Sequence, residues 1–211
     1  MQHHRRARRA ALAEPRGLHS FRRCRRQAAK QGRPPNDRWA ASDNARASYG
    51  YLLANHYGYT GSRLAFGGYA WAGGGNNPQA ADLVDQLTST RSRLTDGKLQ
   101  PCPYVVIINL GENGAPKAET VIAALHKLRE RTSATTRIFV MVPVSGRSRA
   151  EVTSAVEIYL SRSKHPKTQL IDLGPIQFET ADGHPPTAAG HQTIYEAARP
   201  QFDQLLGKAF R

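Results

Sequence analysis

Two polar segments of this chain carry the residue types that serve in acyl-transfer chemistry. Asn113 follows the apolar stretch 105–110, with Gly111 two positions before it. The second segment, 182–185, reads Asp-Gly-His-Pro. A side-chain amide donates a hydrogen bond to a developing oxyanion, and an imidazole oriented by a carboxylate acts as a general base. The two segments therefore supply an oxyanion donor, a base and an orienting acid.

Each of these residues also has an ordinary structural interpretation. A histidine before proline, such as His184, is commonly a turn residue, although Asp182 two positions earlier favours the role of a base. His191 is a competing base, but a histidine hydrogen-bonded near the start of a helix is the more common case. Asn113 suits a simple tight turn about as well as an oxyanion site. These alternatives stay open on the sequence alone.

Alternating strand-like and helix-like patterns predict the elements that position these residues. Short apolar runs predict strands, of which 104–110 has the pattern of a central strand covered on both faces; the runs are 62–66, 104–110, 137–142 and 169–173. Helical spacing predicts helices at 49–56, 80–87, 121–128, 152–160 and from 187 onward, the last kinked or broken at Pro200. This alternation predicts an α/β protein, a three-layer α/β sandwich with a mainly parallel sheet.

In such sheets ligands bind beyond the carboxyl ends of the strands. Gly68, Asn113 and His184 each follow a predicted strand, so we expect them to meet at that edge. Tyr69 and Trp71, which follow Gly68, either line a site for an acyl group or sugar or stand on a surface loop.

Composition allows one domain and an unusual N-terminal segment. The hydrophobic share of 39% suffices for one core, and two cysteines make no disulfide framework. The chain lacks the long apolar run of a membrane span. Residues 1–38 hold 12 of the 30 Lys and Arg but 2 of the 16 Asp and Glu, so the net charge of +14 lies mostly there. We expect 1–38 to be a disordered segment or a short basic helix, and 39–211 to be the folded domain.

The basic segment leaves few specific roles open. Its arginines would contact nucleic acid only non-specifically, because Phe21 is the one aromatic residue available for base stacking. It is not a secretion signal as it stands, since no apolar stretch follows the positive charge. Secreted and cytoplasmic locations both remain open.

The order of these blocks resembles the SGNH (GDSL-type) hydrolases over roughly residues 39–207. The resemblance rests on Gly-x-Asn after a central strand, Gly after the preceding strand, and the Asp-Gly-His-Pro block before the last helix. It implies a flavodoxin-like fold and hydrolysis of acyl or acetyl esters, including those of carbohydrates, through an acyl-serine intermediate. It also implies no metal or organic cofactor. By position, Asn113 and Gly68 (or Gly67) would be oxyanion donors, His184 the base and Asp182 its orienter.

The chain departs from the family pattern in two places. The family usually places its Asp three residues before the His, whereas Asp182 lies two before His184. The Gly-Asp-Ser block of the family falls on Gly32, Arg33 and Pro34, and proline has no nucleophile. The apolar strand that should precede this block is absent or degraded as well.

Three explanations of the missing serine remain. In the first, the chain is a non-catalytic relative that binds a carbohydrate or lipid. In the second, Ser42 replaces the nucleophile, although it equally suits a helix start beside the expected caps Asp43 and Asn44. In the third, 1–38 is not the evolved segment, because Arg-, Ala- and Pro-rich stretches arise when a GC-rich coding sequence is read out of frame. Loss of the first strand would leave sheet edges open. We therefore expect low stability, which a cooperative thermal transition above about 60 °C would contradict.

Overall fold

The computed structural model describes residues 45–60, 69–73, 79–88, 91–92, 94–100, 102–163, 165–180, 183 and 186–207. Several sequence predictions fall outside these residues and stay predictions. They are the basic segment 1–38, the strand 62–66, the caps Asp43 and Asn44, and the site residues Ser42, Gly68, Asp182 and His184.

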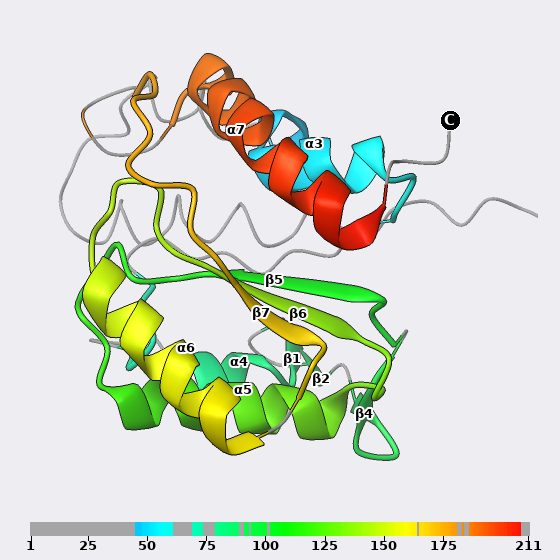
Figure 1. The fold of residues 1–211 in the computed structure, drawn as a ribbon. Helices are drawn as coiled ribbons and strands as arrows, with labels where there is room; N and C mark the ends of the chain where they lie inside the picture. Colours follow the sequence, from blue (N-terminus) through cyan, green and yellow to red (C-terminus); the bar gives the residue numbers. More distant parts are fainter. Residues whose placement is uncertain are drawn as a thin grey trace, which may run out of the picture.

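A parallel three-stranded sheet forms the centre of the described fold (Figure 1). Its strands are β5 (Val105–Asn109), β6 (Arg137–Met141) and β7 (Thr168–Ile171), in the order β5-β6-β7. The strands predicted at 104–110, 137–142 and 169–173 are confirmed, with ends that differ by one or two residues. Within the described sheet β6 is the middle strand, and β5 pairs with β6 alone.

Helices cover both faces of the sheet, which confirms the predicted three-layer α/β architecture (Figure 1). One layer contains α5 (Ala118–Arg131) and α6 (Arg149–Ser163), and the other contains α3 (Tyr49–His56) and α7 (Ala188–Leu206). Side chains of β5 alternate between two apolar clusters: Val106 and Ile108 pack in the first layer, and Val105 and Ile107 in the second. Strand β5 is therefore covered on both faces, as predicted.

The predicted apolar helix faces are the ones that the fold buries. In α5, Val121, Leu125 and Leu128 point into the core, and in α6 Val152 and Val156 do so. Residues recurring every three to four positions lie on one side of a helix, so a stripe of apolar side chains closes over the sheet. This burial against β6 supplies the main apolar core of the described chain.

Helix α3 begins at a cap that the sequence reasoning did not choose. A short 3₁₀ turn, Ala45–Ala47, precedes it, and the Oγ of Ser48 accepts a hydrogen bond from the Tyr51 amide at 3.3 Å. A serine at this position satisfies one of the free amide donors of the first helical turn.

The segment 80–99 corrects the sequence prediction of a helix over 80–87. Helix α4 covers only Ala80–Leu83, and two short antiparallel pairs follow: β1 (Gln86–Thr88) with β2 (Arg91–Ser92), and β3 (Leu94–Thr95) with β4 (Lys98–Leu99). Leu87 therefore lies in a strand. The turn between β3 and β4 is Asp96-Gly97, with φ of 51° and 71°. An Asp-Gly pair with positive φ at both positions is the preferred two-residue hairpin turn.

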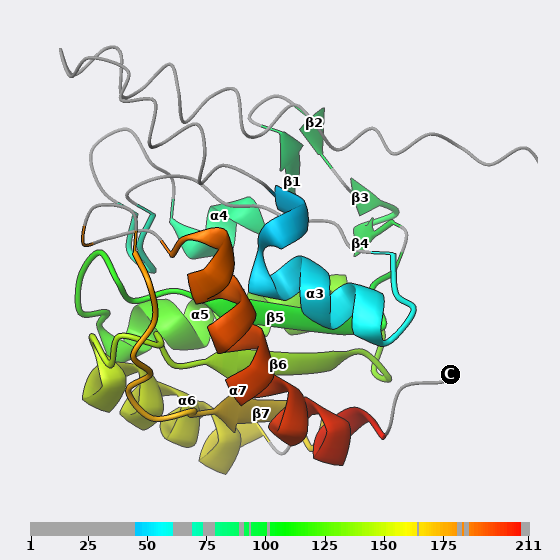
Figure 2. The same cartoon turned by 90° about the horizontal axis from the view of Figure 1, so that it is seen from above.

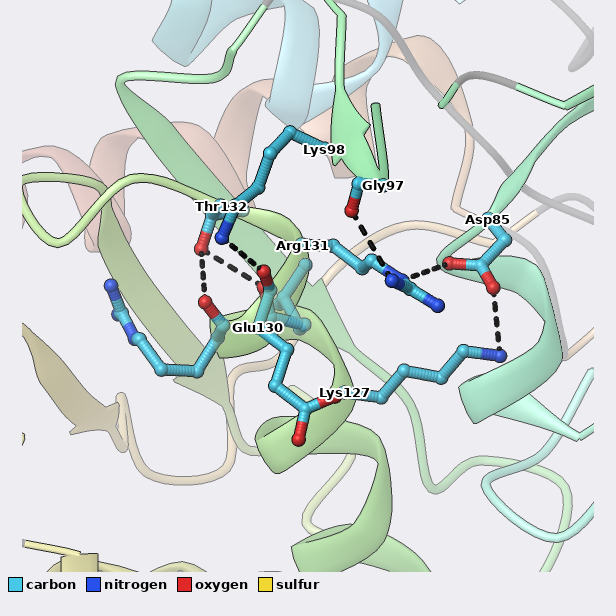
Figure 3. A network of polar contacts seen from close by, with 9 residues as sticks. Asp85, Gly97, Lys98, Lys127, Glu130, Arg131 and Thr132 are labelled. Atoms are coloured by element: carbon cyan, nitrogen blue, oxygen red, sulfur yellow. Dashed lines mark hydrogen bonds and ion pairs between the residues drawn. The ribbon is translucent and has the colours of Figure 1, made fainter. Parts of the chain in front are cut away.

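Polar contacts fasten the β3–β4 hairpin to the end of α5 (Figure 3). Lys98 Nζ donates to the Glu130 carbonyl at 2.5 Å, and Arg131 donates to the Gly97 carbonyl at 3.2 Å. Asp85 accepts from Arg131 at 3.2 Å and pairs with Lys127 at 3.0 Å. Cations near a helix C-terminus satisfy its free carbonyls and complement its dipole. These contacts therefore hold the hairpin against the C-terminal end of α5.

Helix α7 continues through Pro200, so the predicted break is wrong. Phe202, two residues later, is fully buried and packs edge to face on Phe139 of β6 at 5.2 Å between ring centroids. Gln201 donates to the Asp172 carbonyl at 3.2 Å. A helix-interior proline costs about 3 kcal/mol, and these tertiary contacts offset that cost. None of the helices in the described residues is both long and apolar enough to cross a bilayer.

Candidate active site

The turn after β5 brings the predicted oxyanion residue to the carboxyl edge of the sheet. Gly111 has a φ of 131°, and a Cβ there would lie 2.9 Å from Pro143 Cγ. No residue with a side chain fits this position without moving the loop after β6. Close packing of the two loops thus explains the glycine, and Asn113 follows it on the exposed surface.

A specific hydrogen bond orients the Asn113 amide. Its Nδ2 donates to the Tyr69 carbonyl at 2.9 Å. The amide nitrogen carries two hydrogens. One is committed to Tyr69, and the second is available to a ligand at the same edge. Tyr69 directly follows Gly68, so the bond joins the two parts of the chain from which we expect oxyanion donors.

The aromatic residues after Gly68 belong to the core, which overturns both sequence interpretations of them. Trp71 is 0% exposed and Tyr69 is 5% exposed, so neither stands on the surface. Trp71 Nε1 donates to the Leu110 carbonyl at 2.9 Å, and Tyr69 Oη donates to the Gln79 carbonyl at 3.0 Å. Burial raises the pKa of Tyr69, because the charged phenolate is disfavoured there. The two rings anchor the segment that holds Asn113 in place.

Further contacts join the loops after β5 and β6. Ser145 Oγ donates to Glu112 Oε1 at 2.6 Å, and Ser148 Oγ donates to the Gly111 carbonyl at 2.9 Å. The Arg147 guanidinium donates to the Glu112 carbonyl at 3.4 Å. Hydrogen bonds from both loops therefore hold the turn before Asn113. Sequence reasoning missed these partners, although a carboxylate immediately after a predicted strand was a usable signal.

A similar arrangement is present where β7 ends. Arg149 donates to both carboxylate oxygens of Asp172, at 2.5 and 2.6 Å, and the Gly174 amide donates to the same carboxylate at 2.9 Å. Charge-assisted pairs of this kind fix geometry more strongly than neutral hydrogen bonds. The start of α6 is thereby tied to the chain that leads toward the Asp-Gly-His-Pro block.

The flanks of that block close on each other. Thr180 pairs with Pro186 in an antiparallel bridge, and the Thr187 amide donates to the Glu179 carbonyl at 3.0 Å. A Cβ at Gly190 would collide with the Glu179 carbonyl oxygen, so only glycine permits this contact. Thr187 caps α7 by accepting from the Gly190 amide at 3.1 Å. The two flanks of the block therefore lie together at the first turn of α7, which starts where the sequence predicted.

His191, the competing base, is half-buried in the first turn of α7. Its Nδ1 is buried without a hydrogen-bond partner, which contradicts the prediction of a hydrogen-bonded histidine for that nitrogen. The ring lies 5.8 Å from the ring of Tyr49, whose Oη accepts from Asn109 Nδ2 at 2.9 Å. Burial lowers the pKa of His191 and raises the pKa of Tyr49 to about 12, because both charged forms lose hydration. His191 therefore packs against Tyr49, in surroundings that favour its neutral form.

Of the residues assigned to the predicted site, Asn113 is the one that lies within the described part of the chain, where its amide is hydrogen-bonded to the Tyr69 carbonyl. Among the described residues there is no cluster of three or more His, Cys, Asp or Glu side chains that could hold a metal ion. What these contacts offer chemically is an oriented amide donor at the carboxyl edge of the sheet.

Comparison with known proteins shows which solved structures share the fold of this chain. No family profile matches the chain, and no curated protein matches it in sequence. Among solved structures, a family two carbohydrate esterase from Clostridium thermocellum in complex with cellohexaose aligns with a TM-score of 0.64 at 24% identity, over 78% of this chain and 56% of that one. An acetyl xylan esterase, Est2A, from Butyrivibrio proteoclasticus aligns with a TM-score of 0.65 at 15% identity, over 78% and 56%.

A third structure carries an additional domain. The carbohydrate esterase family 2 enzyme of Corynascus thermopiles (Myceliophthora fergusii), solved with a carbohydrate binding domain, aligns with a TM-score of 0.63 at 17% identity, over 78% of this chain and 58% of that one. This chain thus spans little more than half the length of the structures that it matches. Family 2 carbohydrate esterases belong to the SGNH hydrolases. The described chain accordingly has an α/β/α fold like that of the SGNH hydrolases.

Proposed function

We propose that this protein is a carbohydrate esterase that removes acyl or acetyl groups from sugar hydroxyls. One observation carries the proposal: in a fold shared with family 2 carbohydrate esterases, Asn113 lies at the carboxyl edge of β5 with its amide oriented by the Tyr69 carbonyl. An oriented side-chain amide at that edge is the part of an ester hydrolase that stabilises the tetrahedral intermediate.

The proposed reaction assigns one role to each residue. The Ser42 hydroxyl oxygen attacks the ester carbonyl, and its proton passes to the His184 imidazole, which Asp182 orients. The second N–H of Asn113 and the Gly68 amide donate to the oxyanion. Collapse of the intermediate breaks the ester bond, and His184 returns its proton to the departing sugar oxygen. Water, deprotonated by His184, then releases the acyl group from serine.

Two variants test the assigned base and oxyanion donor against p-nitrophenyl acetate and an acetylated xylan. His184→Ala is expected to abolish turnover. Asn113→Ala is expected to lower kcat about 10²–10³-fold with little change in KM, because its hydrogen bond strengthens in the transition state. His126→Ala, an exposed histidine of α5 on the far helix layer, is the matched control and should retain wild-type rates. Turnover unaffected by His184→Ala would refute the assigned base.

The nucleophile has its own test. A fluorophosphonate probe followed by peptide mapping should label Ser42, and Ser42→Ala should remove both label and turnover. Labelling of another serine would reassign the nucleophile while leaving the esterase proposal intact.

A second candidate function is non-catalytic carbohydrate binding at the same carboxyl edge of the sheet. It is favoured by Pro34 at the position of the family's nucleophile. One structure that shares the fold, with a TM-score of 0.59 at 15% identity over 76% of this chain and 58% of that one, bears the description of an esterase active site with divergent catalytic and non-catalytic binding functions. Saccharide binding that Asn113→Ala weakens, with no turnover of any ester and no probe labelling, would support this candidate over the first.

A further inference from the structure

Three tyrosine rings lie in a row at the opposite end of β5 from Asn113. Tyr57 and Tyr59 follow the end of α3, and Tyr104 immediately precedes β5; these three residues are called the tyrosine platform. The rings of Tyr57 and Tyr59 stack with centroids 6.0 Å apart and an interplanar angle of 28°. Tyr59 and Tyr104 follow at 5.7 Å and 57°. Figure 2 shows the loop after α3 beside the start of β5.

Exposure marks this platform as a surface feature. Tyr59 is 38% exposed and Tyr104 is 55% exposed, and they are the exposed large hydrophobic residues of the described chain. Tyr57 is buried beneath them and ties the platform to α7, because its Oη donates to Asp203 Oδ1 at 2.8 Å. The inner ring is therefore held rigidly, and the outer two rings face solvent.

Polar groups adjoin the inner ring. Asp203 accepts from Arg199 at 3.1 Å and lies 3.3 Å from His56 Nε2. His56 packs edge to face on Tyr57 with ring centroids 4.8 Å apart. The side chains of Arg199, His56 and Asp203 are partly exposed. The platform thus combines ring faces with hydrogen-bonding groups at its border.

We propose that the tyrosine platform is a binding site for a neutral polysaccharide chain, separate from the Asn113 edge. The faces of a pyranose ring carry C–H groups that pack on aromatic rings, and its equatorial hydroxyls pair with polar groups around them. Tyrosine suits this surface because its ring is apolar and its hydroxyl is polar. The choice of a saccharide rests on the proposed function.

The size of the surface favours a saccharide over a protein partner. At 38% and 55% exposure, and with roughly 200 Å² for a tyrosine side chain, the two outer rings offer about 200 Å². A stable protein interface covers about 800 Å² on each partner. Two outward rings whose centroids are 5.7 Å apart match a sugar unit or two instead.

The platform also lies far from the proposed chemistry. Strand β5 separates Tyr104 at its start from Asn113 beyond its end, so one short ester cannot contact both. A polysaccharide held at the platform would keep the enzyme on its substrate without occupying the catalytic edge. Loss of the platform should then leave hydrolysis of small esters unchanged.

Titration calorimetry on the full chain with unacetylated cellohexaose and xylohexaose tests this site. The wild type should bind at least one of them, and Tyr59→Ala and Tyr104→Ala should each lower the association constant about tenfold. Tyr104→Phe keeps the ring and should retain binding, which separates stacking from a general loss of structure. All variants should hydrolyse p-nitrophenyl acetate at the wild-type rate and keep the wild-type thermal midpoint.

Several results would contradict the proposal that the tyrosine platform binds a saccharide. These are no binding of either saccharide up to roughly 10 mM, equal affinity in the alanine variants, or a wild-type dimer in sedimentation that Tyr104→Ala dissociates. Platform-dependent binding by a protein that hydrolyses no ester would instead reject the proposed esterase and leave this inference standing.

Discussion

The two helix layers of this protein are held together by different chemistry. Most of the buried side chains between α5 and α6 are aliphatic, among them Leu125, Val152 and Val156, and one ring contact, His126 on Tyr159, lies beside them. Between α3 and α7 an apolar core is accompanied by titratable groups: Tyr49 packs on His191, and Asp203 of α7 meets His56. Aliphatic burial does not depend on pH, whereas each titratable contact does. The α3–α7 layer should therefore carry most of the pH dependence of stability, and the α5–α6 layer its largest pH-independent part.

The largest effect should come from the aliphatic layer. Leu125→Ala removes a fully buried side chain from α5 and leaves a cavity, so we expect a loss of about 2–5 kcal/mol in the free energy of unfolding. Urea denaturation at pH 6 and pH 8 should give the same loss. A loss that changes strongly between these two pH values would contradict the contrast between the layers.

Asp203→Ala should have the next largest effect, because it removes a carboxylate shared by Tyr57, His56 and Arg199. We expect a loss of about 1–2 kcal/mol, reduced by the partial exposure of the pair with Arg199. The hydrogen bond from Tyr57 lowers the pKa of Asp203 in the folded protein. The stability that Asp203 contributes should therefore be fully present above the pKa of the unfolded carboxyl and be lost as pH falls through the lowered pKa of the folded state. Glu196→Ala, an exposed carboxylate of the same helix, is the matched control and should cost little.

Tyr49→Phe should cost about 1 kcal/mol, because it leaves the Asn109 amide without its acceptor. Burial holds the pKa of Tyr49 near 12, above the ordinary value of 10.0. The unfolded chain therefore releases this proton first, and wild-type stability should fall as pH rises from 10 toward 12. The variant should lack that part of the decline when both proteins are unfolded by urea across this range.

The smallest effect should be that of His191. Burial lowers its pKa below the ordinary 6.5, so the unfolded chain binds this proton more readily. Stability should then rise with pH through the region around and below 6.5. His191→Phe should flatten that rise in urea midpoints measured at pH 5 and pH 8. An unchanged slope would mean that another group titrates in this window.

The site shows how far single-sequence reasoning reaches. Asn113 was identified because an amide after an apolar strand has a predictable place, beyond the carboxyl end of a parallel strand. Its bond to the Tyr69 carbonyl was not foreseen, because it joins residues 44 apart in the chain. The roles of Asn113, Ser42 and His184 are proposals that the variants above test, and the roles of Gly68 and Asp182 are proposals as well.

The errors have physical causes as well. Helix spacing over 80–87 was read from apolar positions alone, while the Asp96-Gly97 turn, a hairpin signal within the sequence, was overlooked. Pro200 was expected to kink or break a helix by its local cost, but α7 continues to Leu206, and the burial of Phe202 stabilises its last turns. Local propensity yields to tertiary packing when the packing is worth more.

The sequence by itself determined the alternation of strands and helices, the faces that they bury and the residue types at the ends of the strands. These follow from the periods of helix and strand, which need only near neighbours. The tertiary structure alone decided that Trp71 and Tyr69 are core anchors, that His191 Nδ1 is buried without a hydrogen-bond partner, and that three tyrosines align at the start of β5. Those outcomes depend on which distant segments meet, and no local pattern encodes that meeting.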